Sequence, residues 1–377
     1  MFKTFDRYIA KQILFGTLFG VFVLSFVLVL GSLFKELIPE MSKYPELGVG
    51  FIFRFSVNSL AYSLIFIIPW ALLVATLLTF GRLSANNELT ALRMTGRSLH
   101  RICAPVFFTA ILCALATLWV NVEAAPRSKA NISQLFFRIA TENPGSMFLE
   151  DEFVNTFPGY SAYTKTRNLI DQKSGHYDIS NLVLVKLDAG RKPEIFIQAE
   201  QAEIRFEEGN REDLFLELNQ AHLESTPGTT DAEFFQHDLI KPGHATLKLS
   251  LEKLREKEKK QKPSYLPSRE LIPVIDAEES PKRKAYLRTE LHKRYSLSCA
   301  CLAFCLVGIP LGVTAQRKET STGLALSIAI AACYFVLLTT AEIFHEDPSA
   351  YPHILIWLPN IIFIPVGLIL FHRLSRK

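Results

Sequence analysis

Cysteine is scarce in this 377-residue sequence, and none lies in the long polar stretch at its centre. Disulfides therefore do not organise that stretch. Cys299, Cys301 and Cys305 lie close together, but their spacing along a helix converges three thiolates poorly and no histidine joins them. We therefore expect no metal site and interpret the cysteines as small packing residues. All six fall in long apolar runs: Cys103, Cys113, Cys299, Cys301, Cys305 and Cys333.

Signatures of catalysis are also missing. The sequence has no phosphate-binding G-x-x-x-x-G-K-[ST] loop, no H-E-x-x-H and no G-x-S-x-G elbow. It therefore predicts a non-catalytic protein that needs no cofactor and hydrolyses no ATP. One polar cluster could bind a cation, but a solvated acidic turn next to prolines is the simpler interpretation. The residues of that cluster are His345, Glu346, Asp347 and His353.

Charge is almost absent from six long apolar runs, although charged residues make up 21% of the chain. Each run is about as long as a bilayer-spanning helix, roughly 20 residues. The sequence therefore predicts an integral membrane protein with six transmembrane helices. The lack of ionisable residues within the runs argues against a secondary transporter. The runs cover residues 12–34, 55–80, 102–122, 295–316, 321–341 and 354–371.

The first run has a competing interpretation as a cleaved signal peptide, because basic residues precede it. Its 23 residues exceed a typical signal-peptide core, and no small-residue cleavage site follows it. We therefore expect a retained first span. In the second run, Pro69 predicts a kink that neighbouring helices can tolerate.

Lysine and arginine are unevenly distributed between the two sides of the six runs. The short segments on one side hold twelve basic residues, and those on the other hold only Lys35, Lys43 and Arg54. Because basic short loops stay in the cytoplasm, both termini are predicted to be cytoplasmic. The net charge of only +4 does not indicate a basic surface that would bind nucleic acid. The twelve are Lys3, Arg7, Lys11, Arg82, Arg93, Arg97, Arg101, Arg317, Lys318, Arg373, Arg376 and Lys377.

Between the third and fourth runs, apolar residues alternate with polar ones. In residues 214–219 and 246–251 every second residue is leucine, which predicts strands with one buried face. We expect an all-β, sandwich or jelly-roll-like domain over residues 123–252, and the charge pattern places it in the periplasm. Other strand candidates are 182–187, 195–199, 202–207 and 232–239.

The complete predicted organisation is a membrane α-helical protein with this β domain inserted. Residues 1–122 hold the first three spans, and residues 295–377 hold the last three. Residues 253–294 are charged and broken by prolines, which is typical of a linker with short helices.

The polar interval 82–101, RLSANNELTALRMTGRSLHR, has the pattern of a short helix near 86–95. Asn86 or Asn87 can cap it, Glu88 suits its first turn, Gly96 can end it, and Ser98 can cap the helix that follows. At helical spacing one side is apolar and another is lined by arginines. Such a helix suits the transmission of force from a soluble partner, and the alternative is a loop that only fixes topology. The apolar set is Ala85, Leu89, Leu92 and Leu99, and the basic set is Arg93, Arg97 and Arg101.

Three stretches carry a resemblance to a known family. They are FDRYIAKQIL before the first span, LLTFGRLSANNELTALRMTGRS after the second, and TELHKRYSLSCACLAFCLVGIPLGV at the fourth. In these the chain resembles the LptF/LptG permeases of the lipopolysaccharide export transporter. The order of three spans, a β domain and three more spans is also that of the family.

The resemblance implies a subunit of an ABC exporter in the inner membrane. A second LptF/LptG-type permease and a dimer of an LptB-type ATPase would complete the transporter. LptC/LptA-like periplasmic jelly-roll proteins would receive the lipopolysaccharide. The helix near 86–95 would be the coupling helix, and Glu88, Leu89, Leu92 and Arg93 would contact the ATPase.

Substrate contacts are expected at the outer ends of the spans, because lipid A carries phosphates as well as acyl chains. Lys35 ends span one there and Arg54 begins span two. The family places a functional basic residue after its first span, and Lys35 fits; snorkelling to lipid headgroups is the competing interpretation. On span one, one apolar stripe would line a lipid cavity or face bulk lipid: Phe15, Phe19, Phe22 and Phe26.

A different class of function also fits these features. The chain would then be a stand-alone membrane scaffold or ligand-binding protein with a β ectodomain. The interval 82–101 would serve topology alone. Stable association with an ATPase separates the two hypotheses.

Overall fold

The structure is a computed structural model that describes residues 4–38, 48–142, 152–154, 160–171, 176–187, 193–207, 210–225, 244–250, 262–314, 320–345 and 347–376. The chain divides into two units. The first comprises Met1–Ile38, Val49–Ile132 and Lys262–Lys377, and the second comprises Pro39–Gly48 and Ser133–Gln261. Each unit has its own architecture.

The first unit is a helical bundle that contains six helices long and apolar enough to cross a membrane. They lie over Phe5–Leu37, Val49–Ala85, Leu99–Phe136, Pro281–Thr314, Gly323–Glu342 and Pro352–Arg376, so the prediction of six spans is confirmed. Pro69 lies inside the second, which is continuous. The helices are longer than the apolar runs because only the part of a helix inside the hydrocarbon core must be apolar, and the helix can continue beyond it with polar residues.

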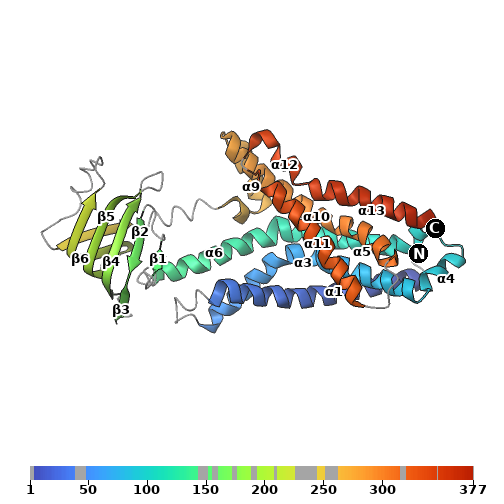
Figure 1. Ribbon diagram of the computed structural model, residues 1–377, viewed down its shortest axis with the longest axis horizontal. Helices are drawn as coiled ribbons and strands as arrows, with labels where there is room; N and C mark the ends of the chain where they lie inside the picture. Colours follow the sequence, from blue (N-terminus) through green and yellow to red (C-terminus); the bar gives the residue numbers. More distant parts are fainter. Residues whose placement is uncertain are drawn as a thin grey trace. The chain divides into compact units, whose positions relative to one another are not determined.

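The elements of this unit begin with α1 (Thr4–Ser32), a π-helical turn η1 (Leu33–Leu37), α3 (Val49–Ala85), α4 (Glu88–Met94) and α5 (Leu99–Trp119). A second π-helical turn, η2 (Val120–Ala124), leads into α6 (Ala125–Glu142), which belongs to the second unit from Ser133 onward. After the β region come η4 (Pro263–Tyr265), α9 (Ser268–Ala277), α10 (Pro281–Thr314) and α11 (Thr320–Glu342). The chain ends with η5 (Pro348–Ala350), α12 (Pro352–Leu355) and α13 (Leu358–Arg376) (Figure 1).

Two segments therefore differ from the predicted boundaries. Residues 125–142, assigned to the β domain, are helical and continue the third span as α6. In the predicted linker, residues 268–277 form α9, and from Pro281 onward the chain already belongs to α10. Polar residues at helix ends caused both differences, because a helix that leaves the membrane loses its apolar signal without ending.

Helix α10 is the centre of the bundle, since it packs against α3, α5, α12 and α13. Buried hydrogen bonds join it to α11 and α13. Asn360 Nδ2 of α13 donates to the Ser296 carbonyl of α10 at 2.9 Å, and the Tyr334 hydroxyl of α11 donates to Asn360 Oδ1 at 3.2 Å. Such bonds satisfy groups that lipid could not. Around them Phe304 and Phe363 pack edge-on against the Tyr334 ring.

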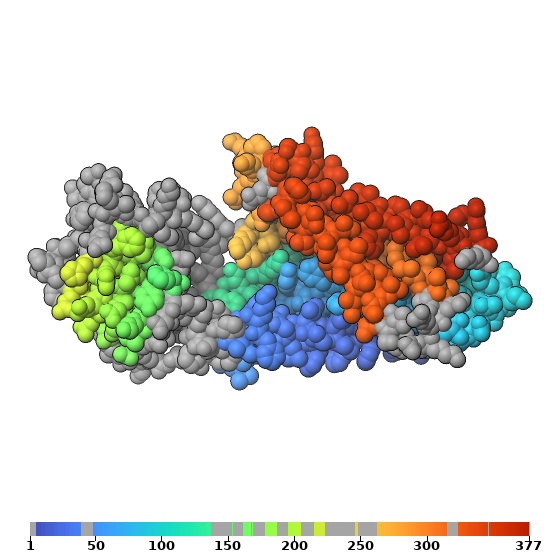
Figure 2. Space-filling model, viewed as in Figure 1, coloured from blue at the N-terminus to red at the C-terminus, as the bar shows by residue number. Residues whose placement is uncertain are grey.

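Helix α1 packs against α3 through small residues. Gly16 and Gly20 lie against Ala75 and Ala71, in a close approach that a Gly-x-x-x-Gly spacing permits. A different side of α1 carries the predicted apolar stripe, and all four phenylalanines are exposed in this chain. Figure 2 shows α1 as the dark blue part of the molecular surface. The stripe is thus available to lipid or to another protein.

The second unit contains an antiparallel sheet. Its described strands are β1 (Glu152–Val154), β2 (Tyr160–Thr164), β3 (Thr166–Asp171), β4 (His176–Leu187), β5 (Pro193–Glu207), β6 (Asn210–Ser225) and β7 (His244–Ser250). They pair in the order β1-β2-β4-β5-β6-β7, and β3 also pairs with β4. An antiparallel β unit is thus confirmed, whereas a jelly roll is not. The strand candidate 232–239 lies outside the described residues.

The buried positions of β4 and β5 change from odd to even residue numbers at one level of the sheet. In β5, Ile195, Ile197 and Ala199 are buried, and then Ala202 and Ile204. At the level of Glu200, Asn181 of β4 and Gln220 of β6 have left-handed backbone, with φ of 51° and 54°. A left-handed residue rotates the strand, so the same face stays apolar. The candidates 195–199 and 202–207 are therefore one strand.

Candidate functional site

The short helix α4 is the feature around which the candidate site is built, and it lies at the end of the bundle that holds both termini (Figure 1). Helix α3 ends at Ala85, and Asn87 turns the chain with a left-handed φ of 57°. Asn87, one of the two predicted caps, stands at the N-cap of α4, but its side chain forms no capping bond. The Asn86 amide donates to Glu88 Oε1 at 3.2 Å. The turn is made by backbone conformation, which asparagine tolerates well.

The end of α4 follows the prediction. Gly96 has a φ of 79°, which is strained for a residue with a Cβ, and its N–H donates to the Arg93 carbonyl at 2.9 Å. Ser98 stands at the N-cap of α5, where its carbonyl accepts the Ile102 N–H at 3.2 Å. Its side chain forms no capping bond. Helix α4 is therefore a separate element between two spans.

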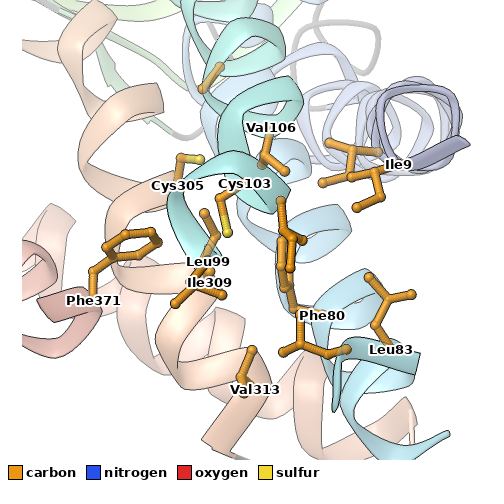
Figure 3. Close-up of a cluster of buried hydrophobic side chains, with 14 of the residues drawn as sticks. Ile9, Phe80, Leu83, Leu99, Cys103, Val106, Cys305, Ile309, Val313 and Phe371 are labelled. Carbon is orange, nitrogen blue, oxygen red and sulfur yellow. The ribbon is translucent and has the colours of Figure 1, made fainter. Parts of the chain in front are cut away.

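The inner side of α4 is anchored in a buried cluster. Leu89 is 4% exposed, Leu99 is buried beside it, and Leu92 packs against the same cluster. Side chains of α1, α3, α5, α10 and α13 surround it, among them Ile9, Phe80, Val313 and Phe371 (Figure 3). The Ser84 hydroxyl also donates to the Val313 carbonyl at 3.0 Å, which ties the end of α3 to α10. The apolar side of α4 therefore faces the buried cluster and anchors the helix in the bundle.

The outer side of α4 includes residues that the sequence reasoning left out. Met94 is 84% exposed, and Thr90 and Ala91 are exposed too. Of the residues predicted to contact an ATPase, Glu88 and Arg93 are half-buried at the sides of the helix. The direct contact predicted for Leu89 is revised to anchoring, because its side chain points into the bundle. The 3.6-residue helical period already predicts that the side of α4 opposite Leu89 and Leu92 faces away from the bundle.

The predicted row of arginines is broken by the turn at Gly96, because Arg93 belongs to α4 and Arg101 to α5. Arg101 Nη2 lies 3.0 Å from Asp6 Oδ2 of α1. The Arg97 guanidinium lies over the Phe5 ring, 5.9 Å from its centroid. Two of the three arginines therefore contact the first turn of α1. Sequence spacing gave no sign of these contacts, which join residues far apart in the chain.

The residues predicted to contact substrate lie at the other end of the same helices. Lys35 is exposed within the π-helical turn η1, and Arg54 is exposed near the start of α3. In the part of the chain that the structure describes, neither forms an ion pair. Insertions of π-helix recur at functional sites, and this one carries Lys35. The structure does not bring the two side chains into contact with each other.

A polar cluster near this end was not predicted as a site. Lys293 of α10 pairs with Glu342 of α11, and the Lys129 ammonium lies 4.6 Å from the Tyr62 ring centroid. A cavity of about 300 Å³ lies here. The only sequence signal was the charged TELHKR stretch at the start of the fourth span. The lining residues are Lys129, Ser264, Tyr286, Thr289, Glu290, Lys293, Glu342 and His345.

The cluster considered for a cation is divided among separate contacts. Two hydrogen bonds from Ser349, one from its hydroxyl at 2.6 Å and one from its N–H at 3.0 Å, lower the pKa of the Asp347 carboxyl. His353 packs edge-on against His292 instead. Glu346 lies outside the described residues. Within those residues no three His, Cys, Asp or Glu side chains are grouped so that they could hold a metal ion.

Comparison with known families decides the class of the protein. The family described as "Lipopolysaccharide export system permease LptF/LptG" matches residues 7–373. The chain belongs to the LptF/LptG family. None of the curated proteins matches it. LptF/LptG proteins are permeases of lipopolysaccharide export and not catalytic subunits, and the six apolar helices accordingly make this member a multi-pass membrane protein.

Proposed function

We propose that this chain is one of two permeases of an ABC transporter that extracts lipopolysaccharide from the inner membrane. An LptB-type ATPase dimer hydrolyses ATP for the transporter, and a second LptF/LptG-type permease completes it. The observation that carries this proposal is α4. It is a short helix with an apolar side fixed in the bundle and an outer side, with Met94, Thr90 and Ala91, left open.

The orientation of the chain follows from its charges. The end of the bundle that holds α4 and both termini carries the larger share of basic residues, so it faces the cytoplasm, where an ATPase is available. The β unit is inserted between the third and fourth spans, so it lies in the periplasm. Glu88 and Arg93, at the two ends of α4, would pair with charges of the ATPase groove.

Lipid enters from the side of α1 in this proposal. The phenylalanine stripe of α1 is exposed along the length of the span and suits acyl chains at a lateral opening between the first and fifth spans. Lys35 and Arg54 suit lipid A phosphates at the outer end. The β unit is a jelly-roll-like domain whose sheet edge aligns with LptC/LptA-like proteins, so that lipid passes along a bridge.

ATP binding would draw the two ATPase subunits together, and α4 would follow as a rigid lever. Its anchoring in the buried cluster supports this mechanism, because a well-packed cluster moves as a body and deforms little. The spans would then close around the lipid and expel it towards the β unit.

The test begins with a gentle detergent pull-down of the tagged chain from its native membrane. Recovery of a P-loop ATPase and a second six-span permease supports the proposal. The complex with Glu88→Ala is then compared with one carrying Glu270→Ala, which also removes a first-turn glutamate, but from α9. We expect Glu88→Ala to lower ATP-driven lipopolysaccharide release and Glu270→Ala to leave it unchanged.

Two outcomes contradict the proposal. If the chain is recovered alone, or only with envelope proteins that lack a nucleotide site, the scaffold hypothesis takes its place. If the Glu88→Ala complex assembles, hydrolyses ATP and releases lipid as the wild type does, α4 is not coupled to the ATPase through this residue.

A further inference from the structure

An ion pair joins the start of α1 to the segment that follows α4. Asp6 Oδ2 of α1 accepts from Arg101 Nη2 of α5 at 3.0 Å. The Asp6 side chain is 3% exposed, whereas that of Arg101 is 55% exposed. A carboxylate that is withdrawn from water in this way needs the opposite charge and hydrogen bonds, so its place is specified by its partners.

The pair lies close to α4 in the chain and in space. Arg101 is in the first turn of α5, five residues after the left-handed Gly96 that ends α4. Between them Arg97 covers the Phe5 ring of α1. Two consecutive arginines of the interval 82–101 therefore contact Phe5 and Asp6, which are adjacent residues in the first turn of α1.

The buried cluster alone does not fix this junction in the same way. Ile9 and Ile13 of α1 reach the cluster that holds Leu89 and Leu99, but the hydrophobic effect that drives this packing has no preferred direction of its own. A charged hydrogen bond has a preferred distance and angle, so it resists rotation of α1 about its own axis. Rotation of α1 is the motion that would turn its phenylalanine stripe.

We propose that Asp6 and Arg101 are positioning residues that carry movement of α4 to α1. Displacement of α4 shifts the first turn of α5, and the pair then draws the start of α1 with it. The stripe of α1 is thereby moved in step with ATP binding. This inference rests on the proposed function, because it requires α4 to be driven by an ATPase.

The experiment uses the complete complex with its ATPase and second permease, reconstituted in lipid vesicles containing lipopolysaccharide. Asp6→Asn and Arg101→Gln each remove one charge with little change of size, and Arg101→Lys retains the charge. Arg127→Gln is the matched control, because it removes the Arg127–Glu123 ion pair elsewhere in the bundle. Assembly, ATP hydrolysis and lipopolysaccharide released per ATP are measured for each.

We expect the two charge-removing variants to assemble and hydrolyse ATP while release per ATP falls about threefold or more. The double variant should fall no further than either single one, because both remove the same link. Arg101→Lys and Arg127→Gln should keep the wild-type ratio. A purely structural pair would lower assembly and leave the ratio of release to hydrolysis unchanged.

The inference is overturned if Asp6→Asn and Arg101→Gln keep the wild-type ratio, or if Arg127→Gln lowers it equally. Should the Asp6→Asn complex fail to assemble, Arg101→Gln still decides, because the Arg101 side chain is half in solvent. If Glu88→Ala lowers release and these variants do not, only this inference fails. If none of them has an effect, the coupling role proposed for Glu88 and α4 fails as well, whereas the permease assignment is decided separately by the pull-down.

Discussion

The Arg294 guanidinium of α10 donates to the Ser268 hydroxyl at 2.9 Å and to the Pro263 carbonyl at 3.2 Å. The residue is only 3% exposed, and Glu290 lies one helical turn away, with its carboxylate 3.6 Å from Arg294 Nε. One buried cation therefore fixes η4 and the start of α9 onto α10. Through it, the chain that returns from the β unit is tied to the central helix of the bundle.

Replacement of Arg294 by alanine should destabilise this contact, because Glu290, Ser268 and Pro263 would each lose the guanidinium that they contact. Breaking a buried pair typically costs about 3–5 kcal/mol in the free energy of unfolding. Arg283→Ala is the control, since the Arg283 side chain is 58% exposed and its pair with Glu278 should be worth less than about 1 kcal/mol. Thermal unfolding of the detergent-purified protein, with hydrogen exchange of residues 268–277, measures both. Equal losses of stability in the two variants would show that Arg294 does not fix η4 and α9 onto α10.

The packing of α1 on α3 leads to a second prediction. A Cβ at Gly20 would meet the Ala71 Cβ at 3.1 Å, so Gly20→Leu must push the two helices apart. Overpacking of this kind typically costs about 1–3 kcal/mol. Gly31→Leu is the control, because a Cβ there meets nothing within 4 Å. We expect a lower unfolding temperature for Gly20→Leu alone, and an unchanged one would contradict the close approach.

The membrane architecture was predictable because a span leaves a long, uncharged signal that no other element produces. The outline of α4 was predictable for a related reason: Gly96 and the apolar spacing of Leu89 and Leu92 are local. The side-chain capping bond expected at the start of α4 is absent, and the reason again lies in a single residue. Asn87 occupies a predicted N-cap position, but it turns the chain with a left-handed backbone and without a capping bond from its side chain, and the residue type alone does not distinguish the two.

The contacts that matter most for the proposed mechanism had no sequence signal. Asp6 and Arg101 are 95 positions apart in the sequence, whereas a helical period relates only residues that lie close together in the chain. The parity change at Asn181 and Gln220 was hidden for a similar reason, because only the paired register shows that both lie at one level of the sheet. Tertiary pairing determined these features, and local patterns do not encode it.

The two sides of α4 give the last prediction, because they separate stability from coupling. Leu89→Ala removes a buried side chain from the cluster below α4 and should lower the free energy of unfolding by about 2–5 kcal/mol. Met94→Ala, on the outer side, should leave unfolding within about 0.5 kcal/mol of the wild type. In the complex, however, Met94→Ala should weaken ATPase binding, because an exposed flexible side chain on this face suits a docking groove. Unfolding curves of the chain alone and titration of the ATPase onto the permease pair measure the two effects. Normal ATPase binding by Met94→Ala together with normal unfolding of Leu89→Ala would contradict the orientation of α4. Met94 would then not contact the ATPase, and Leu89 would not anchor the helix.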